Sequence, residues 1–213
     1  MIVAVANTKG GTGKTTVAVQ LALYQKLIAG RDVWLVDGDE QQSALMAVSL
    51  RSEEELEQIL PCSAYDDGRT LLTQVKTQQS KWDDVIIDVG GRDTDTLRAA
   101  MMVCDVLLIP VQPRSYDVWA LSKLQEIIKT ARSLGADFKA LCFLSCADSQ
   151  GGENEAAEEA ITNYPELTFI KQQLVRRKAF ASAGGLGISV FELKPKDNKA
   201  CKELAELAEA VFN

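Results

Sequence analysis

A glycine-rich loop stands between a short apolar run and a helical pattern near the start of the chain. The apolar run is Ile2–Ala6, the loop is Asn7–Thr16, and a helical pattern covers Thr15–Ile28. Glycines allow successive backbone N–H groups to curl around an anion, and a helix N-terminus adds partial positive charge. The order of strand, glycine loop and helix therefore predicts a phosphate-binding loop within an α/β fold.

The residue types in the loop suit a bound nucleoside triphosphate and its magnesium ion. We expect Lys14 to reach the β- and γ-phosphates and the Thr15 hydroxyl to be a ligand of Mg²⁺. The alternative is a glycine turn that only caps a helix, and the combination of strand, loop, GKT and helix argues against it. The predicted nucleotide-binding residues of the loop are Lys9, Gly10, Gly11, Thr12, Gly13, Lys14, Thr15 and Thr16.

Short apolar runs alternate with longer amphipathic segments along the chain. The predicted strands are Ile2–Ala6, Val33–Val36, Val85–Val89, Val106–Val111 and Ala140–Ser145. The predicted helices are Thr15–Ile28, Asp95–Val103, Val118–Leu134, Glu153–Asn163 and Asn198–Val211. Over Leu50–Ser80 the pattern is least clear, and we expect two short helices and a polar loop. The alternation predicts an α/β P-loop NTPase, with a twisted, mostly parallel sheet between helices, as a single domain over residues 1–213.

Composition excludes several kinds of site. None of the 213 residues is histidine, which excludes imidazole acid–base catalysis and histidine metal ligation. Cys142 and Cys146 lack the close second pair that a zinc site needs, so we expect the five cysteines to be reduced core thiols. The apolar runs are too short to cross a bilayer, and we expect a cytoplasmic protein.

The run from Lys9 to Thr15, KGGTGKT, resembles the deviant Walker A loop of the ParA/MinD family of ATPases. In that family the additional early lysine, here Lys9, reaches across a dimer to the phosphates of the partner and supplies positive charge to the transition state. The alternative for Lys9 is a solvated loop lysine. The resemblance extends from Ile2 to about Val211 and is closest to the short, ParF-like partition proteins.

Two acidic motifs follow in the order of the family. Val33–Gln41 is similar to a strand that ends in D-x-D-P-Q, with glutamate in place of the proline. The family position of Asp39 orients the attacking water, and that of Asp37 supports the loop lysines and magnesium. The alternative is a pair of surface carboxylates in a turn. Val85–Asp88 resembles a Walker B strand. The resemblance therefore implies catalytic roles for Lys9, Lys14 and Asp39, and magnesium binding by Thr15, Asp37 and Asp88.

Two later segments extend the resemblance. Ile109–Asp117 is similar to a P-V-x-P-x-x-x-D segment that lines the dimer interface near the nucleotide, which implies a nucleotide contact for Pro113. Gly187–Glu192 resembles the S-V-F-E element before the last helix of small ParA proteins. That last helix is acidic here and would be repelled by anionic lipid, so we expect no membrane attachment.

The resemblance implies a switch driven by ATP and Mg²⁺. A homodimer would form with ATP, coat the nucleoid without sequence preference, and release it when a small ParB-like or cargo-adaptor protein stimulates hydrolysis. The cargo could be a plasmid, a chromosome or a protein body such as a carboxysome. The alternative is a metabolic enzyme on the same scaffold, similar to dethiobiotin synthetase or nitrogenase reductase, although the cysteine spacing does not resemble that of the iron–sulfur reductases.

Basic side chains gather in the last third of the chain, against a net charge of −7. Such a local patch can bind DNA phosphates whatever the net charge. The resemblance places a DNA-contacting arginine at Arg177. The alternative is a solvated face with scattered ion pairs to Glu192 and Glu203. The residues that we expect to contact DNA are Lys171, Arg176, Arg177, Lys178, Lys196 and Lys199.

Overall fold

The computed structural model describes residues 1–53, 58–114, 120–149 and 152–213. Its strands are β1 Ile2–Val5, β2 Val33–Gly38, β3 Cys62–Ala64, β4 Asp84–Val89, β5 Val106–Val111, β6 Lys139–Ala147 and β7 Thr168–Val175. Its helices are α1 Lys14–Leu27, α2 Ser43–Glu53, α3 Gly68–Gln78, α4 Asp95–Met101, α6 Leu121–Ser133, α7 Glu153–Ile161, α8 Lys178–Leu186 and α9 Asn198–Phe212, with a 3₁₀ turn η1 at Gln79–Lys81.

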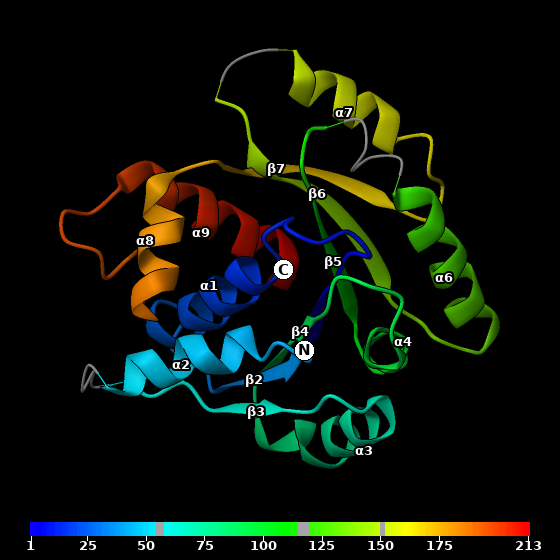
Figure 1. Cartoon of the computed structure of the whole chain (residues 1–213), viewed down its shortest axis with the longest axis horizontal. Coiled ribbons are helices and arrows are strands. Elements are labelled where there is room, and N and C mark those ends of the chain that lie inside the picture. Colours follow the sequence, from blue (N-terminus) through cyan, green and yellow to red (C-terminus); the bar gives the residue numbers. More distant parts are fainter. Residues whose placement is uncertain (54–57, 115–119, 150–151) are drawn as a thin grey trace.

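Within the described ranges, the strands form one parallel sheet in the order β3-β2-β4-β1-β5-β6-β7. Helices α1, α2, α8 and α9 cover one face, and α3, α4, α6 and α7 cover the other (Figure 1). The sheet and its two helical layers confirm the predicted α/β P-loop NTPase fold. Because all strands run the same way, their carboxyl ends meet at one edge, where ligands bind in such folds.

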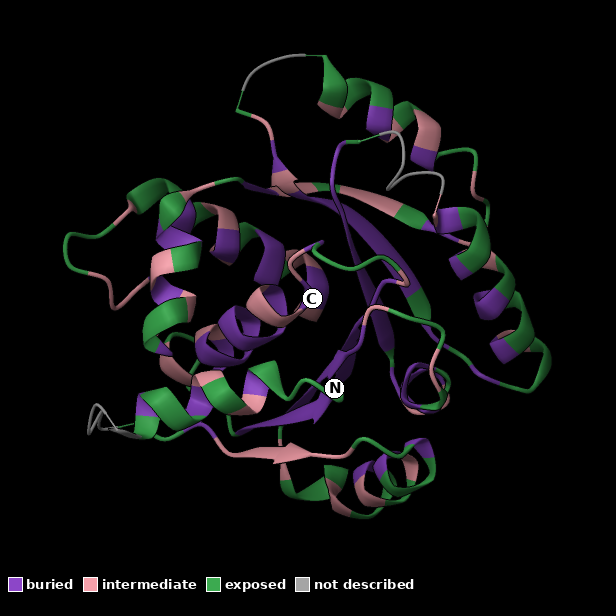
Figure 2. Cartoon of the chain, in the orientation of Figure 1, coloured by how far each residue is buried: buried purple, intermediate pink, exposed green. Residues whose placement is uncertain are grey.

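Because both faces of the sheet are buried, the strands have continuous apolar sequences instead of alternating apolar and polar residues. Figure 2 shows the central strands buried along their length. Val3 and Val5 belong to the core that also contains side chains of α1 and α9, whereas Ala4 belongs to the core on the other face. The last helix presents its predicted apolar face to the core, with Leu204 and Leu207 fully buried.

The sequence analysis did not predict the two edge strands, β3 and β7. Strand β3 has three half-buried residues, too few for any periodic pattern. Strand β7 contains a polar centre, and only its last two residues are buried. An edge strand has a single neighbour and tolerates such side chains. The prediction for Leu50–Ser80 was therefore incomplete, because it lacked β3 and because α2 already begins at Ser43. The predicted helix start at Val118 lies outside the described residues.

Candidate nucleotide-binding site

The glycine-rich loop joins β1 to α1 at the carboxyl edge of the sheet. Gly11 and Gly13 adopt φ values of 78° and 87°, a left-handed conformation that favours glycine. A Cβ atom at Gly13 would also lie 3.0 Å from the Ser145 hydroxyl oxygen. Helix α1 starts at Lys14, and Gly13 offers no side chain to cap it. The N–H groups at this helix start are therefore suited to an anion.

Lys14 lies inside the loop. Lys14 is only 8% exposed, and its Nζ donates a hydrogen bond to the Lys9 carbonyl oxygen at 3.1 Å. Burial lowers the pKa of Lys14, while the charges of Asp88 and Asp39 oppose that shift. A Cβ atom on Gly91 would lie 3.2 Å from the Lys14 ammonium, so the loop after β4 closes over it. Lys9, in contrast, is exposed.

Asp88 lies near the carboxyl end of the buried strand β4, paired in register with Val5 of β1. It is fully buried, and neither carboxylate oxygen has a hydrogen-bond partner of ordinary geometry among the described residues. Burial raises the pKa of Asp88 to about 7, while the neighbouring Thr15 hydroxyl and the Lys14 ammonium oppose that shift. A buried carboxylate without a partner, next to a hydroxyl, offers the oxygen atoms that Mg²⁺ prefers. These residues therefore fit a magnesium ion.

The described residues contain no cluster of three or more carboxylate, thiol or imidazole side chains that could hold a metal ion alone. Mg²⁺ usually binds through one or two carboxylates, waters and the phosphates of its substrate. The site around Asp88 and Thr15 therefore suits a magnesium ion that arrives with a nucleotide better than one held by protein groups alone.

Asp37 and Asp39 follow at the end of β2, which lies next to β4 in the sheet. The two oxygens of Asp37 accept hydrogen bonds from the backbone N–H groups of Asp39, at 3.0 Å, and Leu45, at 2.9 Å. Burial raises the pKa of Asp37, and these backbone hydrogen bonds oppose the shift. Asp37 thus connects the loop that contains Asp39 (the Asp39 loop) to the first turn of α2 through these two hydrogen bonds. The Asp39 carboxylate is half-exposed and faces Gly90, where a Cβ atom would lie 3.4 Å from its Cγ.

We expect the nucleotide-free protein to lose stability as pH rises from about 4 towards 7 at Asp88. The pKa of Asp88 is about 7 in the folded chain and 3.8 as an ordinary side chain, so the folded state holds the proton that the unfolded state releases in this window. Asp88→Asn should remove this loss. Urea unfolding of both proteins at pH 5 and pH 8, without nucleotide and Mg²⁺, measures the difference.

The exposed Asp66 supplies the control variant, Asp66→Asn, which should keep the pH dependence of the wild type. Parallel stability curves for wild type and Asp88→Asn between pH 5 and pH 8 would contradict a buried, protonated Asp88.

A pocket of about 200 Å³ opens beside Gly13 at the phosphate loop. It is lined by residues from β6, β7 and α8, among them Cys146 and Phe180, which no sequence motif indicated. Arg176, a residue that we expected to contact DNA, also lines it. These residues come from segments far apart in the sequence, so only the packing of the strands and helices brings them beside the loop.

Gln112 connects the end of β5 to the phosphate loop. Its Nε2 donates to the Gly11 carbonyl oxygen at 2.5 Å, and its Oε1 accepts a hydrogen bond from Arg176 at 3.4 Å. The next residue, Pro113, is buried. Positions 115–117, which complete the predicted interface segment, lie outside the described residues.

The predicted DNA-contacting residues differ in their surroundings. Arg177 forms an ion pair with Glu203 of α9, with its NH2 group 2.5 Å from Oε1. This contact is one of the two ion pairs that the alternative interpretation expected. Glu192 instead binds Arg51 of α2, at 2.8 and 3.1 Å. The side chains exposed to solvent are those of Lys171, Arg176, Lys178, Lys196 and Lys199.

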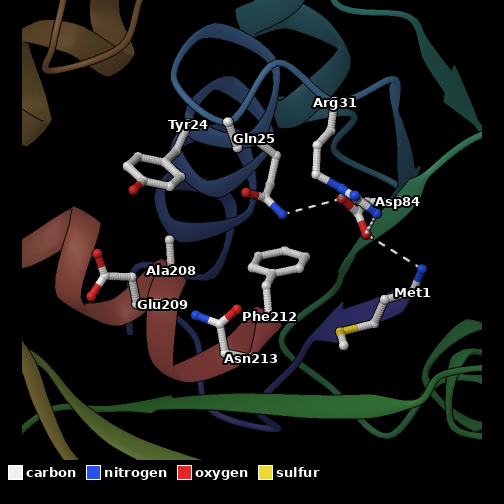
Figure 3. A pocket seen from close by; sticks show the side chains of 10 residues that line it. Met1, Tyr24, Gln25, Arg31, Asp84, Ala208, Glu209, Phe212 and Asn213 are labelled. Atoms are coloured by element: carbon white, nitrogen blue, oxygen red, sulfur yellow. Dashed lines mark hydrogen bonds and ion pairs between the residues drawn. The ribbon is translucent and has the colours of Figure 1, made fainter.

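Another cavity, of about 310 Å³, lies at the amino ends of the strands, away from the phosphate loop (Figure 3). Its buried carboxylate, Asp84, accepts hydrogen bonds from Gln25 at 3.1 Å and from Arg31 at 2.5 Å. No residue predicted to bind nucleotide lines this cavity. In the described part of the chain, no helix is long and apolar enough to span a membrane.

Comparison with known proteins agrees with this geometry. The family model of the CobQ/CobB/MinD/ParA nucleotide binding domain matches residues 3–207. Maintenance of carboxysome distribution protein A from Halothiobacillus neapolitanus is 31% identical over 98% of this chain and 95% of its own length.

Two solved structures share the fold. An ATP complex of an aspartate-to-alanine variant of McdA from Cyanothece has a TM-score of 0.78 at 18% identity, covering 100% of this chain and 97% of its own. The septum site-determining protein MinD from Pyrococcus horikoshii, complexed with Mg-ADP, has a TM-score of 0.75 at 21% identity, covering 100% and 96%. The family match, the full-length relative and the shared fold show that this chain belongs to the CobQ/CobB/MinD/ParA family of nucleotide-binding domains and is a ParA-type ATPase.

Proposed function

We propose that this ParA-type ATPase binds ATP with Mg²⁺, dimerises around it, and uses slow hydrolysis to position a cargo in the cell. The observation that carries the proposal is the arrangement at the carboxyl edge of the sheet. The buried ammonium of Lys14 and the unpartnered carboxylate of Asp88 lie at one phosphate loop, beside the half-exposed Asp39. The similarity to a carboxysome distribution protein over the full chain supports a positioning role.

Each residue has a role in the proposed reaction. Lys14 binds the β- and γ-phosphates, and Thr15 with Asp88 holds the magnesium ion, which neutralises phosphate charge when bound. Asp39 orients the attacking water. Asp37 keeps the Asp39 loop attached to α2 through the hydrogen bonds to Asp39 and Leu45. Gln112, at the end of β5, supports the loop through its hydrogen bond to the Gly11 carbonyl oxygen, and Pro113 contacts the nucleotide.

The dimer is tested by size-exclusion chromatography with ATP and Mg²⁺, with ADP and Mg²⁺, and without nucleotide. We expect a dimer with ATP only, because the exposed Lys9 contacts the γ-phosphate of the partner's nucleotide. A monomer under all three conditions would overturn the proposed switch. The neighbouring gene is informative about the cargo, because a small basic or coiled-coil protein encoded there would be the adaptor.

The proposed dimer also binds the nucleoid through exposed lysines. Lys171 lies on β7, Lys178 begins α8, and Lys196 and Lys199 lie before and within the start of α9. Helices α8 and α9 lie on the same face of the sheet, and the edge strand β7 packs against α9 (Figure 1). Phosphate contacts of this kind are independent of sequence, and a dimer doubles their number. Arg177 contributes less free charge because it is bound to Glu203.

We expect the double variant Lys178→Glu, Lys199→Glu to lose ATP-dependent DNA binding while it still dimerises with ATP. Each lost phosphate contact should reduce the slope of log affinity against log salt by about 0.9. A mobility-shift assay with unrelated DNA fragments over a salt series measures both the DNA affinity and its salt dependence. Lys76→Glu, an exposed lysine of α3, is the control. Arg177→Glu is a poorer test, because it would place two like charges together at Glu203.

If the wild-type dimer does not shift DNA at low salt, nucleoid binding is wrong for this protein. If the double variant binds DNA as the wild type does, the contact surface lies elsewhere.

A further inference from the structure

A cationic hollow lies beside the phosphate loop. Its volume is about 430 Å³, and we call it the Lys9 hollow. Arg92 comes from the loop after β4, and Lys123 from the first turn of α6. Helix α6 lies on the other side of the sheet from α8 and α9 (Figure 1). The residues that line it are Thr8, Lys9, Arg92, Asp93, Ala120 and Lys123.

The charges of the Lys9 hollow favour a polyanion. Asp93 is the acidic residue of its lining, and both of its oxygens are bound by Arg98, at 3.0 and 3.1 Å. With Asp93 engaged in this way, the lining carries three cationic side chains and no second acidic one. Arg92 and Lys123 are exposed and can reach a ligand from outside the chain. Cations gathered around a concave surface raise the local concentration of anions.

The hollow lies outside the phosphate loop. The Lys14 ammonium is inside, where it donates to the Lys9 carbonyl oxygen. Gly91 packs closely against both Gly10 and Lys14, because a Cβ atom on Gly91 would lie 3.2 Å from Gly10 Cα and 3.2 Å from Lys14 Nζ. Lys14 does not line the hollow, so the hollow is a separate surface next to the loop. Lys14 and Thr15, the residues expected to hold the phosphates and magnesium of the chain's own nucleotide, are absent from the lining, so the hollow is available to an anion of another molecule.

We infer that Arg92 contacts the triphosphate bound by a second copy of this chain, next to Lys9, and that Lys123 strengthens the contact. This inference rests on the proposed ATP dimer. In a twofold dimer in which Lys9 of each subunit contacts the nucleotide of its partner, the hollow that Lys9 shares with Arg92 lies next to that nucleotide. The planar guanidinium of Arg92 can donate two parallel hydrogen bonds to phosphate oxygens and stabilise the charge that develops during hydrolysis. DNA phosphates are the competing ligand, but Lys178 and Lys199, the lysines changed in the DNA-binding test, lie on α8 and α9 across the sheet from α6.

Mixing two inactive variants tests whether Arg92 acts across the dimer. Arg92→Ala should bind ATP as tightly as the wild type but hydrolyse it at least tenfold more slowly, since a cation of this kind contributes about a thousandfold or more. Asp39→Ala should also fail to hydrolyse ATP. In a mixed dimer, the Arg92→Ala subunit keeps Asp39 and receives Arg92 from its partner. An equal mixture, combined before ATP is added, should therefore regain about a quarter of wild-type turnover, because about half of the random dimers contain one complete site.

Lys129→Ala is the matched control on α6, because that ammonium is paired with Glu126 at 3.1 Å and does not line the hollow. Arg92→Lys should recover part of the activity. An inactive mixture that still dimerises with ATP would overturn the inference, because Arg92 would then act within its own chain. Normal hydrolysis by Arg92→Ala with weaker DNA binding would also overturn it and make the hollow a DNA site. A wild type that never dimerises would instead refute the proposed function, and the inference with it.

Discussion

Lys14→Ala is expected to abolish measurable ATP binding. The Lys14 ammonium lies inside the loop, held at the Lys9 carbonyl, where it can donate to the β- and γ-phosphates. Two charge-assisted hydrogen bonds of about 1.5–3 kcal/mol each would be lost, which lowers affinity by at least about a hundredfold. Titration with a fluorescent ATP analogue, with Mg²⁺ present, measures the effect.

The control for this variant is Lys26→Ala in the last turn of the same helix, where the lysine pairs with the exposed Asp32 at 3.0 Å. It should bind ATP as the wild type does. Since Lys14 is buried near Asp88, its loss also changes the charge balance of the site, so thermal unfolding should confirm that the variant is folded. Unchanged nucleotide affinity in a folded Lys14→Ala protein would show that this loop is not the nucleotide site.

Asp39→Ala and Lys9→Ala are expected to stop hydrolysis in two different ways. Asp39 is half-exposed and is held by the loop that Asp37 fixes, so its removal should leave ATP binding intact. Hydrolysis should fall by roughly a hundredfold or more, and the ATP dimer should accumulate. Lys9→Ala should lose about a thousandfold in hydrolysis and remain a monomer with ATP, because its ammonium serves the partner's nucleotide.

A phosphate-release assay measures hydrolysis, and size-exclusion chromatography with ATP and Mg²⁺ distinguishes the dimer expected for Asp39→Ala from the monomer expected for Lys9→Ala. Glu40→Gln, at the exposed neighbour of Asp39, is the control and should retain hydrolysis within a few-fold of the wild type. A Lys9→Ala protein that dimerises normally would remove the cross-subunit role of Lys9. An Asp39→Ala protein that hydrolyses ATP at the wild-type rate would exclude Asp39 as the residue that orients water.

Local patterns in the sequence predicted the parts of this protein that depend on neighbouring residues. The phosphate loop is contiguous, so its glycines, Lys14 and Thr15 could be recognised together. The buried strands could be recognised because burial on both faces leaves continuous apolar runs. Asp37 and Asp88 were identified through the resemblance to the acidic motifs of the family, and the parallel strands bring the two residues to one edge.

Tertiary structure decided which partner each polar side chain has, because such contacts join segments that no local pattern connects. The pairing of Arg177 with Glu203 depends on how the end of β7 meets α9, and the hydrogen bond from Gln112 to the phosphate loop spans 101 positions. The edge strands β3 and β7 form because a neighbouring strand supplies their hydrogen bonds. The sequence alone thus determined the phosphate loop and the class of fold, whereas the packing of distant segments determined which charges remain available to a ligand.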